Sequence, residues 1–145
     1  MSKRVITFGT FDLFHLGHLN IVKRARQLGD YLIVGVSSDA LNYSKKKIYP
    51  IYPIDHRLEI VRAIRYVDEA FVEESLEMKR EYILRYHANV LVMGDDWAGR
   101  FDEFKDICEV VYLSRTPVIS SSEIKIVCQN PEASHPARWD LWQPA

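Results

Sequence analysis

The stretch TFGTFDLFHLGH, residues 7–18, decides how the rest of the chain is interpreted. It begins inside an apolar run, residues 5–9, whose β-branched and aromatic side chains predict a buried strand. Apolar residues then recur at helical spacing from about residue 18 to residue 28, and Gly29-Asp30 predicts the end of that helix. Residues 31–36 are apolar almost without interruption, which is typical of a strand covered on both faces. Strand, short turn, helix and strand together predict a βαβ unit.

The same alternation continues along the chain. Further strands are predicted at residues 69–72, 89–93 and 110–113, and helices at residues 55–67, about 75–86, 101–108 and 122–127. The polar stretch at residues 37–47 predicts a loop that continues through Pro50 and Pro53. Strands that alternate with helices predict an α/β fold: a Rossmann-like, doubly wound, five-stranded parallel sheet in a single domain, residues 1–128. Residues 129–145 form a C-terminal tail that fits no predicted element.

Composition narrows the class of protein. The chain has 145 residues, which suits one domain, and 48% hydrophobic with 27% charged residues is the balance of a globular protein. A net charge of −1 gives no general attraction to nucleic acid or to an anionic membrane, and no stretch has the length of a membrane span, so neither partner is expected. Cys108 and Cys128 are isolated thiols outside any Cys/His cluster, which argues against structural zinc and favours a reducing compartment. We therefore expect a cytoplasmic protein.

The polar residues with the most unusual chemistry follow the ends of the predicted strands. They lie at residues 10–18, 37–47, 95–97 and 115–122. The carboxyl ends of parallel strands meet at one edge of a sheet, and ligands of doubly wound folds bind there. The sequence therefore predicts a binding site at this edge.

His15 and His18 allow three interpretations. They are a core or helix-capping pair, a metal-binding pair at i,i+3 that lacks a third ligand at suitable spacing, or part of a phosphate site. The phosphate interpretation rests on Gly9 and Gly17, which permit close backbone approach, and on the free N–H groups where a helix begins near His18. Two imidazoles there can donate hydrogen bonds to phosphate oxygens as charge builds during group transfer. Spacing alone leaves all three interpretations open.

Residues 9–18, GTFDLFHLGH, resemble the HxGH signature of the nucleotidyltransferase superfamily of small α/β enzymes. Four further segments, in chain order, are similar to the cytidylyltransferase branch of that superfamily and to its glycerol-3-phosphate cytidylyltransferases. They are Lys45-Lys46-Lys47, residues 63–69, MGDDW at residues 93–97, and residues 108–116 with ISSS at 119–122. The resemblance extends from about Lys3 to about Lys125, which is most of the chain.

The resemblance implies a reaction. CTP and an alcohol phosphate, with glycerol 3-phosphate as the expected acceptor, give a CDP-alcohol and pyrophosphate by direct attack on the α-phosphorus. It also implies Mg²⁺ bound mainly by triphosphate oxygens, a homodimer, and a product used for cell-surface polymers. The alternatives are cytidylyl transfer to phosphocholine, phosphoethanolamine or a sugar-type phosphate, adenylyl transfer to a flavin or heptose phosphate, and a nucleotide-sensing module without turnover.

The resemblance also implies roles for three groups of residues. Those implied to be catalytic are His15, His18, Lys45 and Lys47. Those implied to bind the nucleotide are Thr10, Phe11, Gly17, Asp96, Arg115, Thr116, Ile119, Ser120 and Ser121. Those implied to bind the acceptor are Asp12, Arg57, Arg65, Asp68 and Trp97.

Ordinary structural roles stand beside these implied ones. A lysine triplet is usually a solvated surface, an arginine on an amphipathic helix is usually exposed, and a serine run before a helix usually caps it. The chain also differs from the family pattern in two places: the loop before Arg57 is one residue longer, and Pro117-Val118 replaces an acidic-glycine pair. In the tail, the side chains expected to cover an apolar patch, a partner or the acceptor pocket are His135, Arg138, Trp139 and Trp142.

Overall fold

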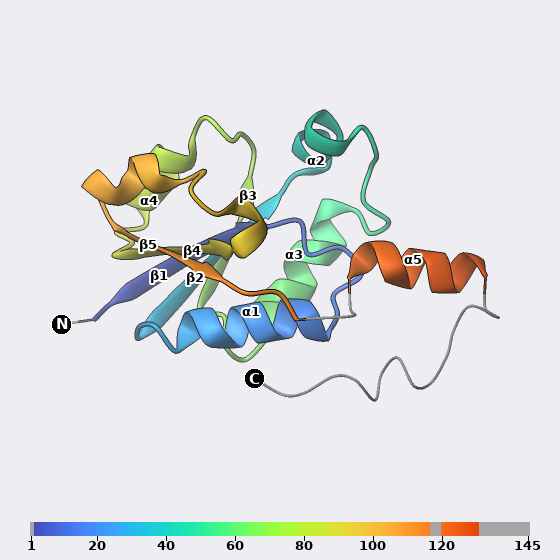
Figure 1. Ribbon diagram of the computed structural model, residues 1–145, viewed down its shortest axis with the longest axis horizontal. Helices are drawn as coiled ribbons and strands as arrows, with labels where there is room; N and C mark the ends of the chain where they lie inside the picture. Colours follow the sequence, from blue (N-terminus) through green and yellow to red (C-terminus); the bar gives the residue numbers. More distant parts are fainter. Residues whose placement is uncertain (1, 117–119, 131–145) are drawn as a thin grey trace.

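The computed structural model describes residues 2–116 and 120–130 (Figure 1). Its strands are β1 (Arg4–Gly9), β2 (Tyr31–Ser37), β3 (Glu69–Glu73), β4 (Val90–Gly94) and β5 (Glu109–Leu113). Its helices are α1 (Leu16–Arg26), α2 (Asp39–Lys46), α3 (Ile54–Ala63), α4 (Lys79–Arg85) and α5 (Ser121–Gln129), with 3₁₀ turns η1 (Asp95–Trp97) and η2 (Asp102–Asp106). The five strands are parallel in the order β3-β2-β1-β4-β5, which confirms the predicted doubly wound sheet.

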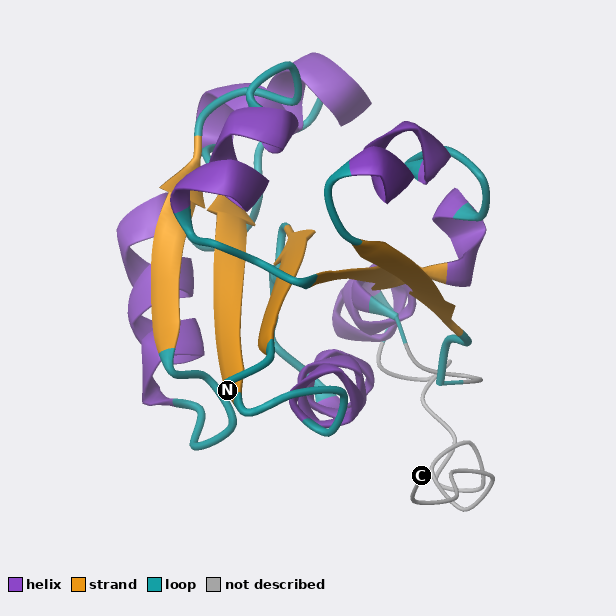
Figure 2. Cartoon of the chain, turned by 90° about the vertical axis from the view of Figure 1, so that its left-hand side faces the viewer, coloured by secondary structure: helices purple, strands orange, loops and turns teal. Residues whose placement is uncertain are grey.

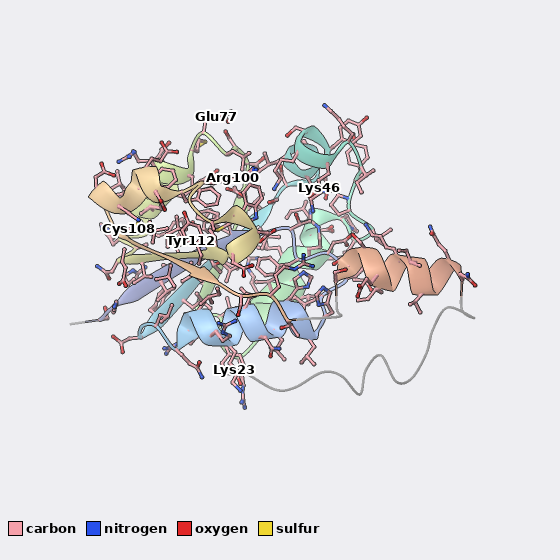
Figure 3. All side chains as sticks on the ribbon, in the orientation of Figure 1. Lys23, Lys46, Glu77, Arg100, Cys108 and Tyr112 are labelled. Atoms are coloured by element: carbon pink, nitrogen blue, oxygen red, sulfur yellow. The ribbon has the colours of Figure 1, made fainter. Side chains whose placement is uncertain are left out.

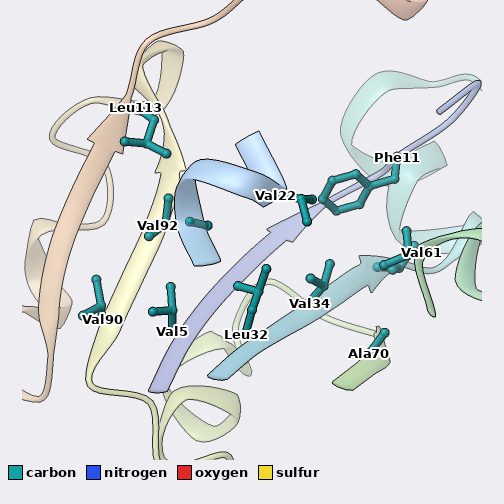
Figure 4. Close-up of a cluster of buried hydrophobic side chains, with 12 residues drawn as sticks. Val5, Phe11, Val22, Leu32, Val34, Val61, Ala70, Val90, Val92 and Leu113 are labelled. Carbon is teal, nitrogen blue, oxygen red and sulfur yellow. The ribbon is translucent and has the colours of Figure 1, made fainter. Parts of the chain in front are cut away.

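Helices cover both faces of the twisted sheet (Figure 2). α1 and α3 pack on one face, and α4 with η1 and η2 packs on the other. α1 is amphipathic: Val22 and Ala25 are buried against the sheet, whereas Lys23 points away from it (Figure 3). The apolar cluster on the α1 face consists largely of valines, and it draws residues from all five strands and from α1 and α3 (Figure 4). Because helices cover both faces of the sheet, its strands carry apolar side chains on both faces.

The turn between α1 and β2 depends on close backbone packing at Gly29. A Cβ atom on Gly29 would lie 2.3 Å from the carbonyl oxygen of Lys3. Asp30 then donates its N–H to that oxygen at 2.8 Å and accepts the Lys3 N–H on its carboxylate, also at 2.8 Å. The helix itself ends at Gln27 in an ordinary right-handed conformation, so Gly29 is required for space rather than for a left-handed cap. This turn fixes the start of β1 beside β2.

The loop predicted at residues 37–47 is wrong, because most of this stretch is α2. Ser38 caps the helix by accepting the Leu41 N–H at 3.1 Å, and the helix buries Leu41 and Asn42. It ends at Lys47, which is left-handed with φ 62°. Only one of the eight residues of α2 is both apolar and buried, so the helical pattern is weak, and the polar and lysine-rich sequence predicts a loop instead.

Several predicted helix boundaries are also wrong. α3 begins after Pro53 rather than at an Asp55 cap, and it ends at Ala63 rather than residue 67 because Ile64 is extended. The predicted helix at residues 101–108 is the shorter 3₁₀ turn η2, and the one predicted from residue 75 is α4, which begins at Lys79. α5 continues to Gln129, one residue into the predicted tail. In the described part of the chain, no helix has both the length and the apolar character needed to span a bilayer.

Candidate active site

The turn after β1 has an unusual backbone. Phe11 and Leu13 are both left-handed, with φ 54° and 48°, a conformation that costs non-glycine residues roughly 1–3 kcal/mol each. The Phe11 ring folds back over Gly9, where a Cβ atom would lie 2.9 Å from it. The ring is buried and lies 6.2 Å from Phe14 and 5.4 Å from His18, centroid to centroid. Such strain, held in place by packing, is typical of functional turns.

His15 and His18 close the first turn of α1. His15 is the N-cap residue: its Nδ1 accepts the Gly17 N–H at 3.0 Å, and Nδ1 of His18 accepts the His15 N–H at 3.2 Å. The two rings stack 3.8 Å apart. Because each Nδ1 is an acceptor, each neutral ring carries its proton on Nε2. The arrangement therefore supports both the capping and the phosphate interpretations, since both Nε2–H groups remain donors.

Both imidazoles are held in the neutral form. Burial lowers the pKa of His18 to about 3, and the neighbouring charges of His15 and Lys46 act in the same direction. Burial and the Arg115 guanidinium lower the pKa of His15. At neutral pH the pair thus offers two uncharged donors beside the positive end of the α1 dipole.

The three lysines lie on α2 and its C-cap rather than on the predicted loop. Lys45 is partly buried and donates from Nζ to the Ser37 hydroxyl at 3.3 Å. Lys46, which the resemblance did not single out, is the lysine whose charge acts on His18. Figure 3 shows it on α2. Lys47 is exposed at the helix end. Lys46 is therefore the lysine whose charge reaches the histidines, whereas the Lys45 ammonium lies against Ser37 at the end of β2.

Asp12 connects three segments around the histidine turn. Its carboxylate accepts the Ile51 N–H at 2.7 Å and the Tyr52 N–H at 2.9 Å, and it lies 3.8 Å from Lys125 Nζ. Only 5% of the residue is exposed. Both carboxylate oxygens thus already have protein partners, and the geometry assigns Asp12 to positioning rather than to direct contact with the acceptor.

Arg57 is fully buried beneath the same edge, which contradicts the expectation of an exposed arginine. Its guanidinium donates to the carbonyl oxygens of Tyr52, Thr10 and Ser37 at 2.8 Å each, and to Asp39 at 2.7 Å. These bonds use four of its five N–H groups. Arg57 therefore holds the turns after β1 and β2 together, and one N–H is left for another partner. The hydroxyl of Thr10 adds to this link by donating to Asn42 at 2.8 Å.

The segment after β5 meets the histidine turn from the other side. Ser120 caps α5 by accepting the Glu123 N–H at 3.2 Å, and the Ser121 hydroxyl donates to the Asp12 carbonyl oxygen at 2.7 Å. Thr116 accepts a hydrogen bond from Asn20 of α1 at 3.0 Å. The starts of α1 and α5 consequently lie side by side (Figure 1). Exposed Arg115 acts electrostatically on His15, so it also belongs to this edge.

Asp96 and Trp97 follow β4 in η1, at the same carboxyl edge. Asp96 is exposed, whereas Trp97 is partly buried against Phe101, with ring centroids 5.5 Å apart. Trp97 therefore fixes the turn through packing, and Asp96 remains accessible.

Arg65 and Asp68 lie elsewhere. Both follow the end of α3, and Asp68 accepts the Leu32 N–H at 2.8 Å at the amino end of β2. Arg65 is exposed and donates to the Tyr66 hydroxyl at 2.8 Å. Within one chain the structure does not bring these two residues to the histidine edge, contrary to their implied role in the acceptor site. The reason is that α3 begins at the carboxyl edge, where Arg57 contacts Thr10 and Ser37, and runs to the amino edge, where the chain enters β3.

Two predictions fall on parts of the chain that the structure does not describe. Ile119 and the tail residues from 131 to 145 lie outside the described residues. Within the ranges 2–116 and 120–130, no group of three or more His, Cys, Asp or Glu side chains forms a metal-binding cluster.

Sequence reasoning missed three buried polar residues at the same edge. Ser37, Glu73 and Lys79 are 0%, 1% and 3% exposed. Ser37 and Glu73 end β2 and β3, so the rule that ligands bind beyond strand ends also applies to them. Their position at strand ends was a usable signal, whereas the burial of Lys79 was not visible in the sequence.

Comparisons with known proteins identify the family. The family model of cytidylyltransferase-like proteins matches residues 6–127. Glycerol-3-phosphate cytidylyltransferase of Bacillus subtilis (strain 168) is 53% identical over 124 residues, 85% of this chain and 95% of the relative. The enzyme of the same name from Staphylococcus aureus (strain NCTC 8325 / PS 47) is 48% identical over 124 residues, 85% of this chain and 92% of that one.

Among solved structures, the lipopolysaccharide core biosynthesis protein from Thermoplasma volcanium GSS1 has a TM-score of 0.72 at 24% identity. The match covers 79% of this chain and 98% of that chain, and at this identity it shows the shared fold. The family match and the two relatives go further than the fold, because the family model spans residues 6–127 and the relatives are about half identical over 124 residues. The chain belongs to the cytidylyltransferase family of nucleotidyltransferases.

Proposed function

We propose that this protein joins CTP to glycerol 3-phosphate, giving CDP-glycerol and pyrophosphate. The observation that carries the proposal is the pair of neutral imidazoles at the start of α1, each with Nε2–H available as a donor. Its substrates are taken from two relatives that are about half identical and are named glycerol-3-phosphate cytidylyltransferases. Neither relative favours the alternative acceptors or adenylyl transfer.

The proposed chemistry is a direct displacement. A phosphate oxygen of the acceptor forms a bond to the α-phosphorus of CTP, and the bond from that phosphorus to the bridging oxygen breaks as pyrophosphate leaves. Negative charge grows on the oxygens around the α-phosphorus, and the Nε2–H groups of His15 and His18 donate to them. Preorganised donors of this kind contribute roughly 3 kcal/mol each in comparable sites.

The triphosphate is proposed to lie between the starts of α1 and α5. Backbone N–H groups and helix dipoles converge there, and the side chains of Lys46, Arg115 and Ser120 stand at the same edge. Mg²⁺ is proposed to enter with CTP, because it keeps few protein ligands when triphosphate oxygens are present, and it would neutralise charge on those oxygens.

We further propose that the protein is a cytoplasmic homodimer whose CDP-alcohol product supplies a cell-surface polymer. Exposed Arg65 and its neighbour Tyr66, away from the histidine edge, are candidates for the interface. The mass of the protein in solution, measured by light scattering, tests the dimer.

The reaction is tested by measuring pyrophosphate release with CTP or ATP against a panel of acceptors. The panel contains glycerol 3-phosphate, phosphocholine, phosphoethanolamine, a sugar phosphate, a heptose phosphate and riboflavin phosphate. The expected result is rapid release with CTP and glycerol 3-phosphate, and mass spectrometry should identify CDP-glycerol. Preference for another pair would replace the proposed substrates, and CTP binding without release from any acceptor would support a sensing module instead.

A further inference from the structure

A line of buried polar groups connects the far side of the sheet edge to Lys45. Nζ of Lys79 lies 2.8 Å from Oε2 of Glu73, and Oε1 of Glu73 accepts from the Ser37 hydroxyl at 3.3 Å. The same hydroxyl oxygen accepts from Nζ of Lys45 at 3.3 Å. Glu73, Ser37 and Lys79 are between 0% and 3% exposed. We call this chain of contacts the Glu73 relay.

Donors and acceptors in the Glu73 relay can be arranged in one direction only. Ammonium groups have no acceptor and an ionised carboxylate has no donor, so the Ser37 hydroxyl must donate to Glu73 and accept from Lys45. Each such contact polarises the next, because a hydroxyl that donates to an anion becomes a stronger acceptor for a neighbouring cation. The negative charge of Glu73 thus acts on Lys45 through Ser37.

The Glu73 relay contains two ammonium groups and one carboxylate. Lys79 is also stabilised by the faces of Phe8 and Phe101, whose centroids lie 3.8 and 5.2 Å from Nζ. In the described structure the charges that act on Lys45 are those of Glu73, Lys46, Lys79 and Arg57, and Glu73 is the one carboxylate among them. Burial and the three cations lower the pKa of Lys45, and Glu73 opposes them, so Glu73 is the group that stabilises the Lys45 ammonium at Ser37.

We propose that Glu73 and Ser37 are positioning residues for Lys45, directing its ammonium toward the phosphates at the carboxyl edge of the sheet. Lys79 holds the Glu73 carboxylate at the end of β3 by pairing with it at 2.8 Å. The inference rests on the proposed function and on the catalytic role that the family resemblance implies for Lys45. It assigns a part in the reaction to three residues from β2, β3 and α4 that do not themselves reach the reacting atoms.

The first test removes one hydroxyl. Ser37→Ala should lower kcat about tenfold with a smaller change in the KM for CTP. The reason is that the variant misplaces the Lys45 ammonium, which is proposed to stabilise the transition state. Thr7→Val is the matched control: Thr7 is a buried hydroxyl of the adjacent strand, and it donates at 2.6 Å to Val92 rather than to the relay. Thr7→Val should leave kcat unchanged, while it lowers the free energy of unfolding by about as much as Ser37→Ala does. Equal kcat losses in the two variants would overturn the proposal.

The second test separates charge from stability. Glu73→Gln leaves Lys79 buried without its counter-ion and is expected to destabilise the fold, so the double variant Glu73→Gln with Lys79→Met removes both charges. The double variant should regain stability while kcat stays at least tenfold below the wild type. Full recovery of kcat together with stability would show that Glu73 acts only on the fold and would refute the positioning role.

A third measurement does not depend on activity. In protein labelled with [¹³C]lysine, the side-chain resonance of Lys45, assigned from Lys45→Arg, reports its pKa by NMR. Loss of the Glu73 charge should move that pKa downward in the double variant, and Thr7→Val should not change it. An unchanged Lys45 titration would refute the Glu73 relay. If the wild type forms no CDP-glycerol, the proposed function fails, whereas the NMR titration still decides the relay.

Discussion

The hydroxyl of Ser121 donates to the carbonyl oxygen of Asp12 at 2.7 Å, across 109 positions of sequence. This bond joins the start of α5 to the strained turn that precedes the histidines. The side chain of Asp12 extends the connection to the loop at Ile51 and to Lys125. The two helix starts that we propose for triphosphate binding are thus held in register by one residue of the turn.

Removing this bond should weaken CTP binding. Ser121→Ala is expected to raise the KM for CTP up to about fivefold and to lower Tm by a few degrees, as the loss of one hydrogen bond worth ~1 kcal/mol implies. Ser122→Ala, an exposed neighbour in the same first turn, is the control and should leave both quantities unchanged. Steady-state kinetics at saturating acceptor would test this, and an unaltered KM in Ser121→Ala would mean that α5 is not part of the nucleotide site.

The two roles of His15 can be separated by side-chain choice. His15→Asn retains a cap acceptor but lacks the Nε2–H donor, whereas His15→Ala loses both. Both variants should lower kcat by roughly 10²–10³, while His15→Ala alone should lose ~1 kcal/mol of unfolding free energy. Kinetics and urea unfolding would be measured together, and near-normal kcat in His15→Asn would contradict a donor role.

The pH dependence of stability should reflect the buried imidazole of His18. Its pKa is lowered from 6.5 to about 3 in the folded protein, so the unfolded chain binds a proton between these values and the folded chain does not. With respect to this group, the free energy of unfolding is therefore highest above pH 6.5, and it decreases as the pH falls from 6.5 toward 3. The slope from this group is at most ~1.4 kcal/mol per pH unit. Urea unfolding of His18→Asn from pH 7 to pH 4 should show a shallower decline than the wild type; an equal slope would mean that His18 titrates normally.

The burial of Arg57 predicts a stability defect. Arg57→Met leaves three carbonyl oxygens and Asp39 without their donor, and the expected loss is roughly 3 kcal/mol of unfolding free energy. Arg85→Ala removes an arginine paired with Glu81 on the surface, both more than half exposed, and should cost less than ~0.5 kcal/mol. Calorimetry of both variants would test this contrast, and comparable Tm values would place Arg57 outside the folded core.

Two glycines should respond differently to an added methyl group. In Gly29→Ala the new Cβ meets the Lys3 backbone oxygen, which cannot move freely, so we expect a loss of about 1–3 kcal/mol in stability. In Gly94→Ala it would meet the Asp96 carboxylate at 2.6 Å, a side chain that can rotate away. That variant should keep its Tm and lose activity if Asp96 contacts nucleotide. Thermal unfolding and kinetics distinguish the two cases, and a large Tm loss in Gly94→Ala would argue against this reasoning.

The sheet could be predicted because its strands are nearly continuous runs of Val, Ile and Leu. The βαβ unit around residues 5–36 is predicted correctly for that reason, and so is the position of His15 and His18 beyond β1. α2 was missed because its helical character depends on the Ser38 cap and two buried side chains rather than on an apolar stripe.

The roles of the arginines could not be predicted from local patterns. Arg57 is buried because four oxygen acceptors from residues 10, 37, 39 and 52 converge on it, and that convergence exists only in the folded chain. Arg65 is only eight positions further along the sequence, yet the end of α3 places it at the opposite edge of the sheet. Because α3 runs from the carboxyl edge to the amino edge, eight positions, about 12 Å of helix, are enough to move a charged residue out of the site.

The capping of α1 by His15 and His18 also affects how activity depends on temperature. The two donors belong to the first turn of a helix, and helix ends open locally at a lower free energy than the fully buried strands. Warming that frays this turn separates the rings while the sheet stays intact. Catalysis should therefore cease, reversibly, at a temperature below the one at which the protein melts.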